Sequence, residues 1–172
     1  MKVVGLAGWS GSGKTTVASR VLPHLVASGL RVSTIKHAHH GFDLDVPGKD
    51  SWLHREAGAT EVMIASGTRW ALMHELRNAP EPPLADLLAR MSAVDLVVIE
   101  GFKREPCPKI EIHRAANGKP WLYPADPTIR AIATDTGVET ALPVVGLDDA
   151  AAIAQLMRTL AMDVAAMDLR RS

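Results

Sequence analysis

The sequence has 172 residues with 19 basic and 19 acidic side chains, so it is long enough for one domain with a sizeable core and carries a formal net charge of zero. Without a basic excess there is no reason to expect a nucleic-acid partner. The single cysteine, Cys107, excludes an internal disulfide framework and a cysteine-based metal cluster, and no apolar run could cross a membrane, so we expect a cytoplasmic protein without a signal peptide.

Strand-like and helix-like segments alternate along the chain. Strands are predicted, in chain order, at Lys2–Ala7, Arg31–Lys36, Glu61–Ser66, Arg69–His74, Asp95–Glu100, Lys109–Arg114, Ile129–Thr134 and Pro143–Gly146. Helices are predicted at Lys14–Ser28, Asp50–Ala57, Pro83–Met91 and Asp148–Met162. Strands that are apolar on both faces indicate a mostly parallel sheet covered by helices. Only Gly67-Thr68 separates the third and fourth strands, which predicts a β-hairpin at the sheet edge.

The segment from Gly8 to Thr15, between the first strand and the first helix, matches the phosphate-binding loop pattern G-x-x-x-x-G-K-[ST]. Glycines in such a loop let successive N–H groups face a polyphosphate, and the helix N-terminus adds unpaired donors and a positive dipole end. Lys14 is expected to reach the β- and γ-phosphates, and the Thr15 hydroxyl to ligate Mg²⁺. The chain is therefore expected to form a P-loop NTPase domain of three-layer α/β/α architecture over residues 1–162, followed by a tail at 163–172.

A second acid for this site is expected at the carboxyl ends of the strands, where ligands bind in open α/β sheets. Glu100 ends an apolar strand at the same edge as the loop, whereas Asp95 lies roughly 16 Å away at about 3.3 Å per residue. Glu100 is therefore the predicted catalytic partner of Lys14; it either holds Mg²⁺ through water or polarises the attacking water. Lys36 ends another strand at this edge and is predicted to neutralise phosphate charge.

The segment His37–Ser51 contains three histidines and several nearby aspartates. Zinc is the weaker interpretation, because structural zinc prefers cysteine or a fixed histidine spacing. A polar loop and a loop that contacts the nucleotide or a partner both remain open. Because Mg²⁺ takes oxygen ligands, Asp45 is predicted as a metal-side residue, and Asp50 either joins it or caps the following helix.

No Asn-Lys-x-Asp guanine motif is present, and Asn117-Gly118-Lys119-Pro120 is expected to be only a turn. A carboxylate can instead select guanine by accepting hydrogen bonds from N1–H and the exocyclic amine together, an arrangement that adenine does not offer. Asp135 follows the strand Ile129–Thr134 at the predicted site edge and is the candidate for this role. An ordinary loop aspartate remains the alternative.

Several segments together resemble the MobB family of molybdopterin-guanine dinucleotide biosynthesis adaptor proteins. They run in family order from about residue 3 to about residue 135, and the Pro-Gly-Lys-Asp-Ser and Glu-Gly-Phe-Lys segments are much more specific than the loop pattern alone. The matching segments are Trp9–Thr16, Ile35–His37 with His39-His40, Asp45–Ser51, Ala57–Ala59, Arg69–Met73, Val98–Lys103 and Lys109–Glu111.

The resemblance implies a homodimer that binds GTP with Mg²⁺, has weak GTPase activity and assists a separate molybdopterin guanylyltransferase. Whether it binds molybdopterin directly, and whether hydrolysis or only GTP occupancy matters, stays open. Together with the residue-based predictions, the nucleotide-binding set is Gly8, Ser10, Gly11, Ser12, Gly13, Lys14, Thr15, Thr16, Lys36, His37 and Asp135, and the metal-binding set is Thr15, Glu100 and Asp45.

An autonomous P-loop kinase or dethiobiotin-synthetase-like ligase is the alternative function. A kinase needs a mobile lid with several arginines, but Lys103-Arg104 is the only adjacent basic pair near the predicted edge. Arg55 and Arg69 are interpreted as isolated surface residues, so the accessory role is preferred.

Two further surfaces are predicted to contact partners. The hairpin at 61–74 is expected to mediate dimerisation through an unpaired edge that carries Trp70, Leu72 and Met73. A basic surface for the pterin phosphate is expected from Lys36, Lys49, Lys103 and Lys109.

Overall fold

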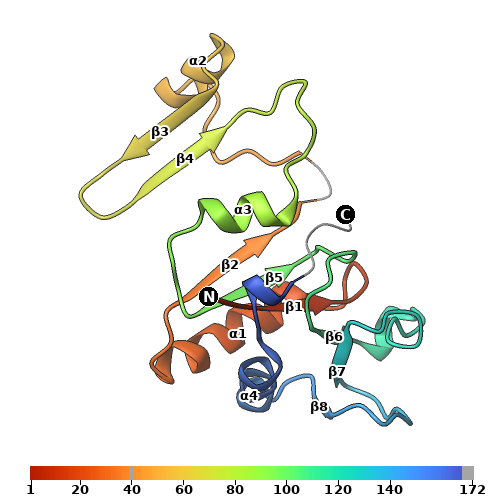
Figure 1. Ribbon diagram of the computed structural model, residues 1–172. Coiled ribbons are helices and arrows are strands. Elements are labelled where there is room, and N and C mark those ends of the chain that lie inside the picture. The colour runs from red at the N-terminus through yellow and green to blue at the C-terminus, as the bar shows by residue number, and fades with distance from the viewer. Residues whose placement is uncertain (39–40, 168–172) are drawn as a thin grey trace. The chain divides into compact units, whose positions relative to one another are not determined.

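The computed structural model describes residues 1–38 and 41–167. These residues form two compact units, each with secondary structure of its own (Figure 1). The large unit comprises Met1–His37 and the chain from Leu84 onward, and the small unit comprises Ala38–Pro83. None of the described helices is long and apolar enough to cross a membrane.

The large unit is built on a single sheet. Its parallel strands lie in the spatial order β2 (Val32–Lys36), β5 (Leu96–Glu100), β1 (Lys2–Ala7), β6 (Lys109–His113), β7 (Ile129–Thr134) and β8 (Val144–Gly146). The short strand β9 (Met162–Asp163) pairs antiparallel with β1. The chain runs from β1 to β2 on one side and later crosses from β5 to β6 on the other, so the strand order reverses beside β1. Such a reversal marks the crevice where open α/β sheets bind ligands.

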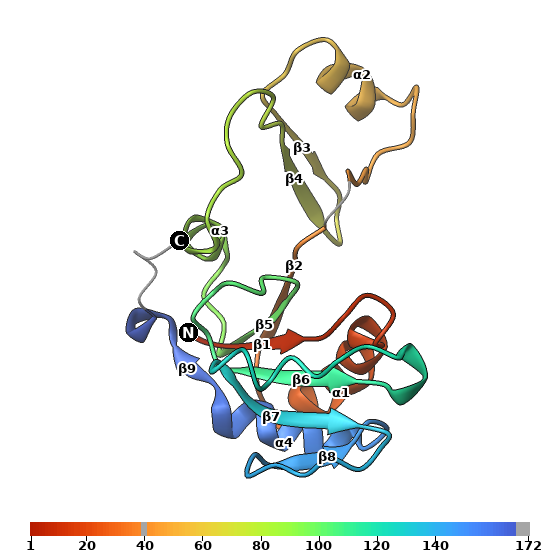
Figure 2. The same cartoon turned by 90° about the vertical axis from the view of Figure 1, so that its right-hand side faces the viewer.

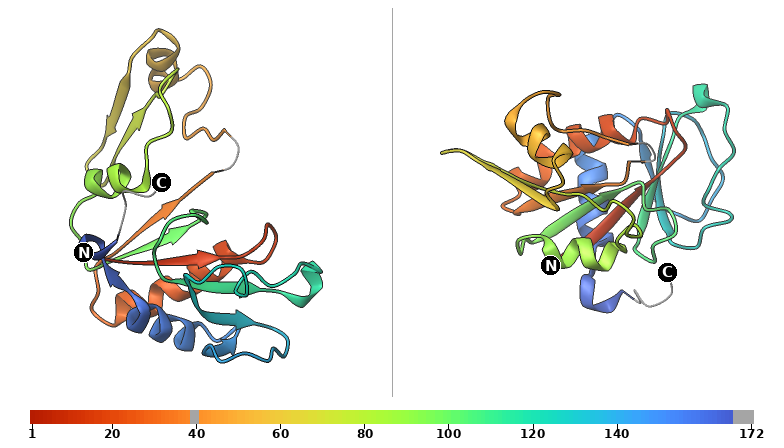
Figure 3. Two further views of the ribbon diagram at one scale, coloured as in Figure 1. Left: turned by 45° about the vertical axis from the view of Figure 1, so that its right-hand side comes forward. Right: turned by 90° about the horizontal axis from the view of Figure 1, so that it is seen from above.

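Helices cover both faces of this sheet (Figures 2 and 3). The helices α1 (Lys14–Ala27) and α4 (Ala150–Leu160) pack on one face, where their apolar residues meet those of the central strands. The helix α3 (Leu84–Arg90) covers the other face, and Met167 packs into the same cluster after the 3₁₀ turn Val164–Ala166. The predicted three-layer α/β/α arrangement with a mostly parallel sheet is confirmed.

The strand register brings the predicted strand-end residues to one edge of the sheet. Leu6 of β1 pairs with Glu100 of β5, and Glu100 pairs in turn with Lys36 of β2. The loop that follows β1 therefore starts beside both charged side chains. Asp95 lies at the opposite edge, where its carboxylate accepts a hydrogen bond of 2.8 Å from the Arg31 backbone N–H. Asp95 therefore lies away from the loop that follows β1, as predicted.

The small unit contains α2 (Asp50–Glu56) and a hairpin of β3 (Glu61–Ala65) and β4 (Trp70–His74). The predicted hairpin is confirmed, but its predicted place at the edge of the main sheet is wrong. Among the described residues, β3 and β4 pair only with each other and form a two-stranded sheet of their own. A tight turn dictates local pairing, whereas joining a larger sheet depends on distant contacts that the local pattern does not contain.

Every predicted helix and strand is present, with ends within two residues of those expected. The strand β9 was not predicted, because two residues are too few to show a periodic pattern.

A pair of neighbouring residues in α1 tests how this helix faces the core. Leu25 is fully buried against the sheet, whereas Val26 is 57% exposed. We expect Leu25→Ala to lower the free energy of unfolding by about 2–5 kcal/mol, and Val26→Ala to change it by at most about 0.5 kcal/mol. Urea denaturation measures both, and equal losses in the two variants would contradict the assignment of this face to the core.

Candidate functional site

The loop Gly8–Gly13 connects β1 to α1 and is here called the glycine loop. A Cβ atom on Gly8 would lie 2.5 Å from Ser12 Oγ and 2.6 Å from the Ile112 carbonyl oxygen, so only glycine fits this position. Gly11 and Gly13 adopt positive φ angles of 80° and 92°, a backbone conformation that residues with a Cβ atom rarely adopt. Within the loop, Ser12 is buried, and α1 begins directly after Gly13.

Lys14 closes the glycine loop from inside. Its Nζ donates hydrogen bonds of 2.9 Å to the carbonyl oxygens of Gly8 and Trp9. Burial lowers the pKa of Lys14, the charges of Lys103 and Lys36 lower it as well, and Glu100 works in the opposite direction. Several cations therefore gather around one acid at this end of the sheet, which is the electrostatic setting that a polyphosphate needs.

Thr15, Glu100 and Lys36 meet at the start of α1. The Thr15 hydroxyl donates a 2.8 Å hydrogen bond to Glu100 Oε1. Lys36 Nζ lies 3.3 Å from Thr15 Oγ1 and 3.8 Å from Glu100 Oε1. The structure thus brings together Thr15, which the loop pattern predicted, and Glu100 and Lys36, which the strand-end argument predicted.

A hydroxyl and a carboxylate 2.8 Å apart are oxygen ligands of the kind that Mg²⁺ prefers. Within residues 1–38 and 41–167, no three His, Cys, Asp or Glu side chains are grouped so as to hold a metal by themselves. Mg²⁺ bound here would therefore take its remaining ligands from a bound phosphate and water, as is usual for this ion. His39 and His40, two of the three histidines considered for zinc, lie outside the described residues.

Glycine is also required directly after Glu100. Gly101 has a φ of 97°, and a Cβ atom there would come within 3.0 Å of the His37 carbonyl oxygen. His37 lies against this turn: its N–H donates to the Glu100 carbonyl at 2.8 Å, and its ring packs at a tilt on Phe102. The predicted site residue His37 therefore borders the Glu100 backbone.

The turn after β6 supports the outer half of the glycine loop. Asn117 donates a 3.0 Å hydrogen bond to the Ser10 carbonyl, and Trp9 Nε1 donates one of 2.8 Å to the Pro120 carbonyl. Lys103 Nζ lies 5.3 Å from the centre of the Trp9 ring. Asn117, predicted to begin a turn, ends the one-turn 3₁₀ helix Ala115–Asn117, and its contact with the glycine loop was not anticipated.

Arg114 and Asp135 lie beside the other half of the loop. Asp135 Oδ1 accepts a 2.8 Å hydrogen bond from the Ala115 N–H, and Oδ2 lies 3.5 Å from Arg114 Nη1. Arg114 Nη2 is 3.6 Å from the point that a Cβ of Gly13 would occupy. Sequence reasoning placed Asp135 near the site but missed Arg114. The usable signal was that Arg114 follows β6, which neighbours β1.

Two expectations for the small unit need revision. Arg55 is not an isolated surface residue: its side chain is 13% exposed and forms 2.8 Å ion pairs with Asp43, Asp45 and Glu75. The three carboxylates raise the pKa of Arg55 further above its ordinary value. Asp50 does not cap α2, because the N-cap position belongs to Lys49.

Asp45 is engaged within the small unit. Its side chain is 2% exposed, and besides its ion pair with Arg55 it accepts a 2.8 Å hydrogen bond from the Ser51 hydroxyl. Its predicted role as a metal ligand stays a prediction, while its contact with Arg55 accounts for its burial.

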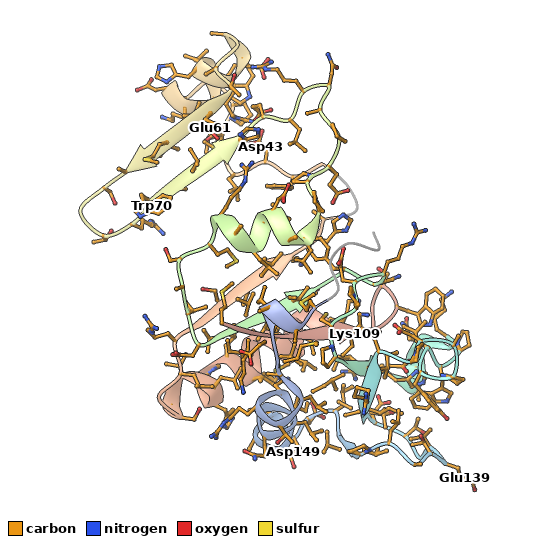
Figure 4. The ribbon with its side chains drawn as sticks, in the orientation of Figure 1. Asp43, Glu61, Trp70, Lys109, Glu139 and Asp149 are labelled. Carbon is orange, nitrogen blue, oxygen red and sulfur yellow. The ribbon has the colours of Figure 1, made fainter. Side chains whose placement is uncertain are left out.

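Lys109 does not belong to a basic surface, contrary to expectation. Lys109, which is labelled in Figure 4, is 2% exposed, and its Nζ donates to the Glu105 carbonyl at 2.7 Å and to Thr128 Oγ1. The neighbouring Glu111 is fully buried, and its two oxygens accept hydrogen bonds from the N–H groups of Leu122 and Tyr123. This segment therefore anchors the chain that covers β6, which is a structural role.

The comparisons with known proteins agree on one family. The MobB family, described as "Molybdopterin guanine dinucleotide synthesis protein B", matches residues 3–135. A molybdopterin-guanine dinucleotide biosynthesis adapter protein of Haemophilus influenzae is 45% identical over 140 residues, 80% of this chain and 76% of the relative. The Escherichia coli protein of the same name is 39% identical over 158 residues, 90% of each chain.

Solved structures of the same kind share the fold. The crystal structure of a molybdopterin-guanine biosynthesis protein B aligns with a TM-score of 0.70 at 27% identity, covering 92% of this chain and 99% of the other. The crystal structure of Bacillus subtilis MobB aligns with a TM-score of 0.72 at 26% identity, covering 93% and 98%.

Because Glu100 raises the pKa of Lys14 and Lys103 lowers it, removing each of these charges should shift this pKa in the opposite direction. Glu100→Gln removes the charge that raises the pKa of Lys14, so we expect it to fall further below the ordinary 10.5. Lys103→Gln removes a charge that lowers it, so we expect the pKa to rise. Titration of the Lys14 ¹³Cε resonance by NMR measures both shifts, and shifts of the same sign would contradict this arrangement of charges.

The same lowered pKa affects stability. Unfolded Lys14 keeps its ordinary pKa, so between the lowered value and 10.5 the unfolded chain binds more protons than the folded one. The contribution of Lys14 to the free energy of unfolding must therefore rise with pH across this window. We expect Lys14→Met to remove that part of the slope in denaturation measured at successive pH values.

Proposed function

Since the chain belongs to the MobB family, molybdopterin guanine dinucleotide synthesis protein B, we propose that it acts as an adapter in the biosynthesis of this dinucleotide by binding GTP with Mg²⁺ at the glycine loop. The observation that supports this most strongly is the gathering of Lys14, Thr15 and Glu100 at the point where the sheet order reverses. A glycine-rich loop and the helix N-terminus that follows it both favour a bound anion.

The proposal assigns a task to each side chain. Lys14 exchanges its two carbonyl partners for the β- and γ-phosphate oxygens, which are better acceptors because they are charged. Lys36 adds a second cation on the Glu100 side. Glu100 and Thr15 would hold Mg²⁺, which supplies charge neutralisation for the phosphates when bound. Glu100 also orients water next to the terminal phosphate, and hydrolysis by this small set of groups is expected to be slow.

Guanine selection is assigned to Asp135. Its carboxylate is 32% exposed beside the glycine loop, and each oxygen has lone pairs beyond those used by Ala115 and Arg114. A molybdopterin guanylyltransferase is the proposed partner, in keeping with an adapter that presents a guanine nucleotide to the enzyme that uses it.

A homodimer is proposed through one face of the hairpin. Met63 pairs with Leu72, and Ala65 with Trp70, so these apolar side chains share a face. Met63, Trp70 and Leu72 are 61%, 65% and 44% exposed, a concentration of apolar surface that favours burial against a second copy. Figure 4 shows Trp70 at the turn end of the hairpin, away from α2.

Calorimetric titration with non-hydrolysable GTP and ATP analogues plus Mg²⁺ tests nucleotide binding. We expect the GTP analogue to bind more tightly than the ATP analogue. Lys14→Ala should weaken binding by roughly 10- to 100-fold, because it removes a charged hydrogen bond to phosphate. Lys2→Ala is the matched control, since Lys2 is exposed at the opposite end of β1.

Other outcomes of that titration would redirect the proposal. ATP preference, or phosphate release near the 1–100 per second usual for kinases without any partner, would favour an autonomous kinase or ligase. No binding by the unmodified protein would contradict the nucleotide assignment itself.

The dimer prediction is tested by light scattering at tens of micromolar protein. We expect a dimer for the unmodified chain and a monomer for Trp70→Asp, which places a charge on the apolar hairpin face. Phe42→Asp is the control, because Phe42 is also exposed in the small unit, at 75%, but does not belong to the hairpin. A monomeric unmodified protein, or loss of the dimer in both variants alike, would count against this face.

A further inference from the structure

We propose that Arg114 determines guanine specificity by positioning the carboxylate of Asp135. The inference rests on the proposed binding of GTP and deepens it, because it assigns a residue that neither the loop pattern nor the strand-end argument includes. Arg114 is a positioning residue here: it acts on the base through Asp135.

The geometry places the Arg114 guanidinium between two parts of the site. Nη1 lies 3.5 Å from Asp135 Oδ2, while Nη2 lies beside Gly13, 3.6 Å from the point that a Cβ would occupy. A guanidinium is planar and presents its donors in a rigid fork, so the branch beside Gly13 and the branch that faces Asp135 keep a fixed direction relative to each other. The guanidinium therefore links the end of the glycine loop, where phosphate is proposed to bind, to the carboxylate proposed to contact the base.

Asp135 has two restraints, one on each oxygen. Oδ1 accepts from the Ala115 N–H at 2.8 Å, and Oδ2 faces Arg114. With both in place, the plane of the carboxylate is defined, and the lone pairs that remain can accept from guanine N1–H and the exocyclic amine together. With Arg114 removed, one backbone hydrogen bond remains, and the carboxylate can rotate about it. Two parallel bonds to guanine require the defined orientation; a single bond does not.

The ion pair between Arg114 and Asp135 is partly exposed, which indicates that it orients the carboxylate and does little to stabilise the fold. The side chains of Arg114 and Asp135 are 40% and 32% exposed, and an ion pair at such a surface adds little to stability. Arg114 is also a cation near the phosphates, and in that capacity it would attract any nucleoside triphosphate equally. If Arg114 determines specificity, its removal changes the ratio of the affinities for nucleotides with different bases. If Arg114 acts only as a charge, its removal lowers all these affinities by the same factor.

Competition between GTP and inosine triphosphate provides that ratio, because the two nucleotides differ only in the exocyclic amine. We expect the unmodified protein to prefer GTP by about tenfold, the value of one hydrogen bond to a charged acceptor. Arg114→Ala should bring the preference close to that of Asp135→Ala, and Arg114→Lys should restore it only in part. Arg130→Ala is the matched control, because Arg130 is an exposed arginine of β7 that precedes Asp135.

A second measurement uses xanthosine triphosphate, which presents a carbonyl where guanine has its amine. Asp135→Asn should shift preference from GTP toward this nucleotide, since an amide can donate to that carbonyl. Adding Arg114→Ala to Asp135→Asn should change the ratio little, because the two residues act as one unit.

The outcomes separate this inference from the proposal beneath it. If Arg114→Ala weakens GTP and inosine triphosphate equally and leaves their ratio unchanged, Arg114 serves only as a phosphate-side charge and the inference is overturned. If the unmodified protein binds no GTP, both the proposed function and the inference fail. Circular dichroism of each variant confirms that the fold is kept, so a loss of ratio cannot be assigned to unfolding.

Discussion

The site depends on one steric constraint: no side chain can be placed at Gly8. The chain leaves β1 so close to β6 and to the loop itself that an added Cβ would fall within 2.6 Å of both Ser12 Oγ and the Ile112 carbonyl. This closeness lets the backbone turn within a few residues and start α1 at Lys14. The side chains from β2, β5 and the end of β6 meet around this turn because it lies where the strand order reverses beside β1. The absence of a side chain at Gly8 thus determines where these side chains meet.

The small unit is organised by a different interaction. Arg55 joins the loop before α2, through Asp43 and Asp45, to the end of β4, through Glu75. A unit of this size has few buried apolar side chains, and Val62 is the one buried hydrophobic residue described in it. In the small unit, the ion pairs of Arg55 therefore hold segments together, as apolar packing does in the large unit. The guanidinium suits the task because its donors point in several fixed directions.

Local patterns in the sequence were sufficient for much of the large unit. The glycine spacing, the apolar strand before it and the rule that ligands meet the carboxyl ends of parallel strands together placed Lys14, Thr15, Glu100 and Lys36 in one location, where the structure has them. The locations of these residues could be predicted because each depends on strand direction and length, which short segments encode.

The features that sequence reasoning missed are contacts between side chains far apart in the chain. Lys109 looked like a surface lysine, yet its ammonium is buried with Thr128 and the Glu105 carbonyl as acceptors. Arg55 looked isolated because its partners come from outside its own helix. Arg114 looked like an ordinary strand end, since nothing in its neighbours shows that Gly13 and Asp135 converge on it. Periodicity describes which way a segment faces, but not what it meets there.

The pairing of β1 has a consequence for the order in which the large unit folds. The strand β1 leads directly into the glycine loop, yet its neighbours β5 and β6 begin only at Leu96 and Lys109, and the carbonyl that crowds Gly8 belongs to Ile112. Because a chain is synthesised from its N-terminus, β1 has neither partner until β5 and β6 have emerged from the ribosome. Such long-range parallel pairing is slow to form. We therefore expect the turn at Gly8 to take its final shape only after β6 has paired with β1.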